Sequence, residues 1–108
     1  MKINITTKNI SLDLPLKTFI EQKVGGLEKF IQKGPVSAVV EIGKPSKRHK
    51  TGPVFYAEIN LKVGGPLLRG EASHKDLRTA IDEARDELYA QIKKLKEKQK
   101  DLSRKPKK

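Results

Sequence analysis

The sequence contains no cysteine and no tryptophan, and only 5% of its residues are aromatic. The absence of cysteine excludes disulfide bonds, thiolate zinc sites and a cysteine nucleophile. The sequence also lacks the glycine-rich phosphate loops of nucleotide enzymes, the HExxH motif of zinc proteases and the GxSxG motif of serine hydrolases. The common signatures of catalysis and of cofactor binding are therefore missing.

Long hydrophobic runs are missing as well. The first ten residues, MKINITTKNI, are polar and alternating, so they do not resemble the apolar core of a signal peptide. No stretch approaches the roughly 20 apolar residues that cross a bilayer. We therefore expect a cytoplasmic protein that does not enter a membrane.

Positive charge, by contrast, is in excess: 24 lysine and arginine residues stand against 13 aspartate and glutamate residues, for a formal net charge of +11. Residues 44–50 (KPSKRHK) contribute +4 and residues 93–108 contribute +7, while the rest of the chain is neutral overall. Charge concentrated in this way is typical of a surface that binds a polyanion, because binding releases the counterions of phosphate groups.

The apolar residues follow two periodicities. Alternation of apolar and polar residues predicts strands at 2–7, 36–42, 54–63 and 67–72. Apolar spacings of three and four predict amphipathic helices over about 16–31 and about 75–100. Strict alternation indicates a sheet that is covered on one face only. We therefore expect an α+β fold in the order β-α-β-β-β-α, with both helices on one face of a four-stranded sheet, similar to double-stranded-RNA-binding domains.

Local signals refine this prediction. Gly25 and Gly26 interrupt the first helical pattern, and each costs about 1 kcal/mol relative to alanine inside a helix. Ser73 and Asp76 form an S-x-x-D pattern that predicts a capping box at the start of the second helix. A length of 108 residues suits one domain, which we expect at residues 1–100, followed by a basic, disordered tail at 101–108.

The residues give little support to a metal site or an active site. The two histidines, His49 and His74, lie in different predicted elements without neighbouring cysteines, a pattern that rarely forms a metal site. Asp76 and Asp82 could act as an acid–base pair. Asp76 fits better at a helix N-terminus, where its charge complements the helix dipole. We expect no catalysis, no cofactor, no metal and no small-molecule substrate.

The second predicted helix carries a line of mostly basic residues beside its apolar line. The spacings place these residues on one face over about 33 Å, and Tyr89 within the line could stack on a base or a ribose. A phosphate partner explains this line better than a solvated helix does, because few glutamate–lysine pairs at spacing four support it. Its members are Arg78, Asp82, Arg85, Tyr89, Lys93, Lys96 and Lys100.

The β-α-β-β-β-α order of elements and two segments together resemble the ribosome hibernation promoting factor family in its short form. This family is also called ribosome-associated inhibitor A or ribosomal subunit interface protein. Residues 76–94 (DLRTAIDEARDELYAQIKK) match the family pattern of an acidic residue, an apolar residue and Ala-Ile-Asp that leads into an amphipathic, lysine-rich helix. Residues 21–30 (EQKVGGLEKF) resemble its first helix. The resemblance covers residues 2–100. The sequence departs from the family pattern at Arg78, where many members have tyrosine, and in the loop at 44–50, which is unusually basic.

The resemblance implies a factor that occupies the channel for messenger and transfer RNA on the small ribosomal subunit and preserves idle ribosomes under stress. Its partners would be the small subunit, its ribosomal RNA and the whole ribosome, and we expect a monomer away from the ribosome. Matching the family pattern gives seven RNA-binding candidates, and the basic loop and the helical line add five more. The full set is Lys23, Lys29, Lys47, Arg48, Lys50, Arg78, Arg85, Tyr89, Lys93, Lys94, Lys96 and Lys100.

Two alternatives stay open at the level of the sequence. The first is a general double-stranded-RNA-binding module, because that fold also sets two helices against a sheet. The second is a regulator of transcription that acts through protein contacts on the open sheet face, where Glu58, Lys62, Arg69 and Glu71 mix both signs of charge.

Overall fold

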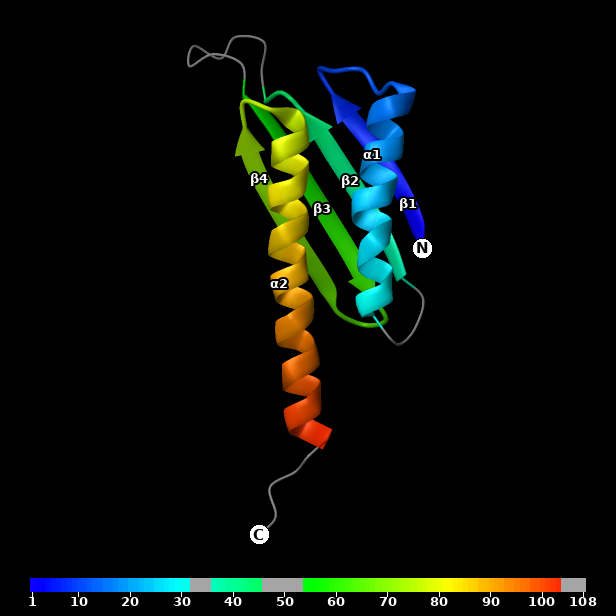
Figure 1. Cartoon of the computed structure of the whole chain (residues 1–108), viewed down its shortest axis with the longest axis vertical. Helices are drawn as coiled ribbons and strands as arrows, with labels where there is room; N and C mark the ends of the chain where they lie inside the picture. Colours follow the sequence, from blue (N-terminus) through cyan, green and yellow to red (C-terminus); the bar gives the residue numbers. More distant parts are fainter. Residues whose placement is uncertain (32–35, 46–53, 104–108) are drawn as a thin grey trace.

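A four-stranded sheet with both helices on one face organises the chain (Figure 1). The computed structural model describes residues 1–31, 36–45 and 54–103, and only the backbone of residues 99–103. The elements follow the predicted order. They are β1 (Lys2–Lys8), α1 (Leu14–Gly25), the 3₁₀ helix η1 (Gly26–Phe30), β2 (Val36–Gly43), β3 (Phe55–Val63), β4 (Leu67–His74) and α2 (Leu77–Ser103).

The sheet is mixed, with the strand order β1-β2-β3-β4. β2 pairs antiparallel with β3, and β3 pairs antiparallel with β4 through the short connection at residues 64–66. β1 pairs parallel with β2, because α1 carries the chain back across the sheet between them. The predicted α+β fold with two helices on one face is confirmed, and the parallel pair follows from the crossover.

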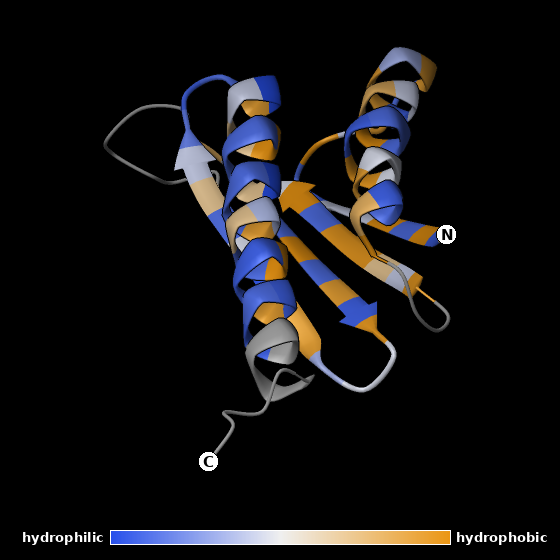
Figure 2. Cartoon of the chain, turned by 60° about the horizontal axis from the view of Figure 1, so that its bottom comes forward, coloured by the Kyte–Doolittle hydropathy of each residue, from blue (hydrophilic) through white to orange (hydrophobic). Residues whose placement is uncertain are grey.

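The core lies between the sheet and the two helices. Alternate residues of the central strands, such as Val40 and Ile59, are fully buried against apolar residues of the helices, such as Ile20 and Leu88. Figure 2 shows this patterning, with hydrophilic residues along the outward side of α2. Among the described residues, every fully buried side chain is apolar. The charged side chains are therefore left on the outer surfaces of the helices and of the sheet.

The first predicted helix is divided in two. The pattern over 16–31 predicts one helix, but α1 ends at Gly25 and a 3₁₀ helix covers Gly26–Phe30. Both glycines keep right-handed helical backbone angles, with φ of −61° at Gly25 and −63° at Gly26. Leu27 remains fully buried. The glycine pair therefore marks a change of helix type rather than a break in packing.

The start of α2 differs from the predicted capping box. Ser73 lies within β4, and the cap is Asp76 alone. The backbone N–H of Thr79 donates to Asp76 Oδ2 at 3.0 Å, and the Thr79 hydroxyl donates to the same oxygen at 2.6 Å. These bonds lower the pKa of Asp76. At its other end α2 reaches Ser103, three residues past the predicted end, so residues 101–103 of the predicted tail are helical.

Side chains of α2 cover the outer edge of β4. The Gln91 amide pairs with the backbone of Arg69: its Oε1 accepts from the Arg69 N–H at 3.2 Å, and its Nε2 donates to the Arg69 carbonyl at 2.6 Å. Glu87 Oε1 accepts from the Glu71 N–H at 3.0 Å. These contacts satisfy polar groups that an edge strand otherwise leaves open. They also fix α2 relative to the sheet.

Candidate RNA-binding surface

The predicted RNA-binding residues of the helices come from α1 with η1 and from α2, which lie side by side on the sheet (Figure 1). α1 and η1 supply Lys23 and Lys29, and α2 supplies the others. Lys29, Arg78, Lys93, Lys94 and Lys96 are exposed, whereas Lys23, Arg85 and Tyr89 are half-buried. Of Lys100 only the backbone is described, and Lys47, Arg48 and Lys50 lie outside the described residues.

Direct contacts join the two helices along a line that we call the interhelical seam. The Arg85 Nε–H donates to the Lys23 carbonyl oxygen at 3.0 Å. Lys23 Nζ lies 3.4 Å from Asp82 Oδ1, which is shielded from solvent and makes no hydrogen bond, so this contact is an ion pair. The seam comprises Phe19, Lys23, Lys29 and Phe30 of α1 and η1, with Arg78, Asp82, Arg85, Tyr89 and Lys93 of α2.

Three aromatic rings lie in this seam, and each has a cation over it. Lys23 Nζ and the Arg78 guanidinium carbon lie 5.5 Å and 5.2 Å from the Phe19 ring centroid. Lys29 Nζ is 5.3 Å from the Phe30 centroid, and Lys93 Nζ is 5.9 Å from that of Tyr89. The Phe30 and Tyr89 rings meet across the helices edge to face, with centroids 4.9 Å apart and planes at 65°.

Arg85 and Tyr89 have structural contacts that the sequence did not indicate. Arg85 uses Nε to hold α1, and its Nη1 lies 3.6 Å from Asp86 Oδ1. Tyr89 packs on Phe30 and beneath Lys93. Phosphate binding by Arg85 and base stacking by Tyr89 therefore stay predictions. The sequence prediction did not include Phe19 and Phe30 in this surface. Phe19 could have been found, because it stands four residues before Lys23, a spacing at which side chains of a helix meet.

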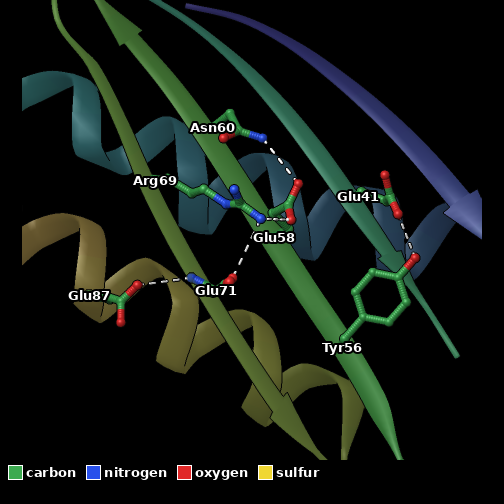
Figure 3. A network of polar contacts seen from close by, with 7 residues as sticks. All are labelled: Glu41, Tyr56, Glu58, Asn60, Arg69, Glu71 and Glu87. Carbon is green, nitrogen blue, oxygen red and sulfur yellow. Dashed lines mark hydrogen bonds and ion pairs between the residues drawn. The ribbon is translucent and has the colours of Figure 1, made fainter. Parts of the chain in front are cut away.

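The opposite, open face of the sheet carries balanced charge (Figure 3). Arg69 bonds Glu58 and lies 3.5 Å from Glu71, while the Asn60 amide donates to Glu58 at 3.3 Å. The Tyr56 hydroxyl donates to Glu41 Oε2 at 2.6 Å. Most carboxylates here already have partners on the same face. The basic line of α2 thus lies on the helical side of the molecule, whereas the open sheet face carries both signs of charge without such a line.

The Tyr56–Glu41 pair gives a prediction for alkaline pH. Desolvation, the hydrogen bond to Glu41 and the charges of Glu41 and Glu58 raise the pKa of Tyr56 from 10.0 to about 12. In an unfolded chain Tyr56 loses its proton near pH 10. The stability that the pair contributes is therefore complete below pH 10 and is lost as the pH rises through about 12.

A variant with one tyrosine can measure this pKa. With Tyr89→Phe, Tyr56 is the sole tyrosine, and tyrosinate absorbance should report its pKa. Glu41→Gln should shift this pKa towards 10; an unchanged titration would contradict the pair.

Within residues 1–31, 36–45 and 54–103, no three histidine, aspartate or glutamate residues gather in a way that could hold a metal ion. No helix in the described part of the chain is long and apolar enough to cross a membrane.

Comparison with known proteins identifies the family. A sequence profile of the family described as sigma 54 modulation protein / S30EA ribosomal protein matches residues 3–100. The chain belongs to this family. The ribosome hibernation promoting factor of Pseudomonas putida is 30% identical over 102 residues, which cover 94% of this chain and 93% of that protein.

Two further similar proteins agree with that assignment. The ribosome hibernation promotion factor of Bacillus subtilis is 33% identical over 98 residues, 91% of this chain but 50% of the longer relative. The crystal structure of the Thermus thermophilus Protein Y N-terminal domain superposes with a TM-score of 0.76 at 29% identity, covering 88% of this chain and 99% of that one. Family membership confirms the resemblance inferred from residues 21–30 and 76–94. It supports a ribosome-associated hibernation role.

Proposed function

We propose that this chain is a cytoplasmic hibernation factor that binds the small ribosomal subunit through the basic side of α1 and α2 and occupies the channel for messenger and transfer RNA. The observation that supports this proposal is the placement of the cations. Lys23 and Lys29 lie on the same side of the sheet as the basic line of α2, away from the mixed charge of the open face. Relatives named as hibernation factors share nearly the whole length of the chain.

The mechanism is steric and electrostatic. Lysine and arginine side chains bind phosphate oxygens, which position the protein on RNA without reading base sequence. Folded ribosomal RNA offers a fixed shape to such a surface. The folded domain then blocks the path of messenger and transfer RNA, and no bond is made or broken. Lys47, Arg48 and Lys50 add a further contact to RNA in this proposal.

The proposed function can be tested by measuring whether the chain excludes messenger RNA and transfer RNA from the small subunit. Purified small subunits saturated with the chain should fail to bind a short messenger RNA and its matching transfer RNA, and messenger-directed translation should stop. Subunits preloaded with both RNAs should in turn bind the chain weakly. A complex that holds the chain, the messenger and the transfer RNA together would contradict occupation of the channel.

Two controls separate the alternatives that the sequence leaves open. An excess of simple RNA duplex should not displace the chain from small subunits, whereas displacement at equal mass would indicate a general RNA-binding module. Nuclease digestion of the RNA should release the chain. A complex that persists after digestion would instead indicate a protein partner.

A further inference from the structure

The aromatic residues of the interhelical seam and its cations occur together. Phe19, Phe30 and Tyr89 are three of the five phenylalanine and tyrosine residues in the sequence, and each is half-buried between the helices and the surface. Each ring lies within 6 Å of at least one lysine or arginine cation. Such contacts are attractive because the face of an aromatic ring is electron-rich.

The arrangement around Phe19 shows what a ring contributes. Lys23 of α1 and Arg78 of α2 approach the same ring, although their like charges repel. The ring attracts both cations, and the Asp82 carboxylate, 3.4 Å from Lys23, offsets part of their charge. Phe30 and Tyr89, which contact each other across the helices, lie beneath Lys29 and Lys93 in a similar way.

We propose that Phe19, Phe30 and Tyr89 are positioning residues that hold these cations in a fixed array, so that the seam favours folded RNA over flexible single-stranded RNA. This inference builds on the proposed function. Lysine and arginine lose much rotamer freedom when they are fixed on a phosphate. A ring that has already restricted the side chain reduces this loss.

Selectivity follows from the rigidity of the ligand. Phosphates of folded RNA have set separations, so they gain most from cations at matching, fixed places. A flexible strand adapts to cations wherever they lie, so it gains little from a fixed array. Removing the rings should therefore weaken binding to folded RNA far more than binding to a single strand, although no charge is lost.

The test compares a leucine variant (Phe19→Leu, Phe30→Leu and Tyr89→Leu) with the unaltered chain on a stable RNA hairpin and on a polyuridine strand of equal length. Affinity for the hairpin should fall about ten-fold because several cation–ring contacts are lost, and affinity for polyuridine about two-fold or less. The dependence of binding on salt should stay unchanged, since the same number of phosphates is neutralised. The affinity for small ribosomal subunits should fall by as much as the affinity for the hairpin.

Two further variants control for packing. Phe19→Tyr, Phe30→Tyr and Tyr89→Phe together keep every ring and should restore hairpin affinity. Phe55→Leu removes a ring of β3 that lies 5.3 Å from the Lys44 ammonium and outside the seam, and it should leave the preference for the hairpin intact. If the triple leucine variant unfolds, Phe19→Leu alone still removes two of the contacts and should show the same selective loss.

Equal losses on both RNAs, or an unchanged hairpin affinity in a folded variant, would overturn the positioning role. The hairpin assay needs no ribosome, so it separates this inference from the proposed function. The unaltered chain could fail to bind small subunits while its preference for the hairpin still depends on the rings. This result would refute the proposed function but support the positioning role.

Discussion

Replacing Lys29, Lys93 and Lys96 together with glutamate should reduce affinity for small ribosomal subunits on the order of 1,000-fold, because each change removes a phosphate contact and adds a repulsive charge. The three side chains are exposed on the helical side, so the fold should survive. Arg85 is left in place because its Nε–H holds the backbone of Lys23. Sedimentation of labelled protein with purified subunits measures the loss, and circular dichroism confirms folding.

A matched variant on the other side of the sheet distinguishes a local surface from an effect of net charge. Lys2, Lys8 and Lys62 are exposed on the strands, and Lys2 and Lys62 share Ser37 as their register partner on β2. Replacing these three with glutamate lowers the net charge by the same amount. Only long-range attraction then changes, so affinity should fall less than about ten-fold at physiological salt. Equal losses in both variants would refute the helical surface.

Gly70→Ala should strongly destabilise the fold, because α2 crosses β4 at this residue without room for a side chain. A Cβ built at Gly70 would lie 2.2 Å from the Ala84 carbonyl oxygen and 3.0 Å from Leu88 Cγ. To relieve this clash, α2 must move away from β4, which would break the pairing of Gln91 with the Arg69 backbone. We expect a loss of about 3 kcal/mol. Thermal unfolding should show a midpoint lower by more than about 10 °C.

Gly26→Ala provides the matched control. The φ of −63° at Gly26 suits any residue, and a Cβ there would meet nothing within 4 Å. Because alanine restricts the unfolded chain, this variant should be more stable by about 0.5 kcal/mol. Equal unfolding midpoints for the Gly70→Ala variant and the unaltered chain would show that α2 does not pack against β4 at this point.

The periodic elements could be predicted from sequence because their signals are local. Alternation along β3 places Ala57, Ile59 and Leu61 in the core, where they are fully buried. The basic line of α2 follows equally from helical spacing. The parallel pairing of β1 with β2 depends instead on the path of α1 across the sheet. The cap at Asp76 differs from its prediction because β4 extends through Ser73 to His74.

The seam could not be predicted, because its contacts join residues far apart in sequence. The pairing of Arg85 with the Lys23 carbonyl spans 62 residues, and no periodicity within one helix specifies how far it lies from another. For the same reason, the sequence could not show that the Phe19 ring lies near a cation from each helix. Sequence thus identified most of the charges of the candidate surface but not the groups that orient them.

A cryo-electron microscopy structure of the chain bound to the small subunit tests most directly whether the helical side is the RNA-binding surface. We expect density for the domain in the channel for messenger and transfer RNA, with Lys23, Lys29 and Lys93 facing phosphates of the ribosomal RNA and the open sheet face turned away. Density outside the channel, or RNA against the sheet around Tyr56 and Arg69, would contradict this account.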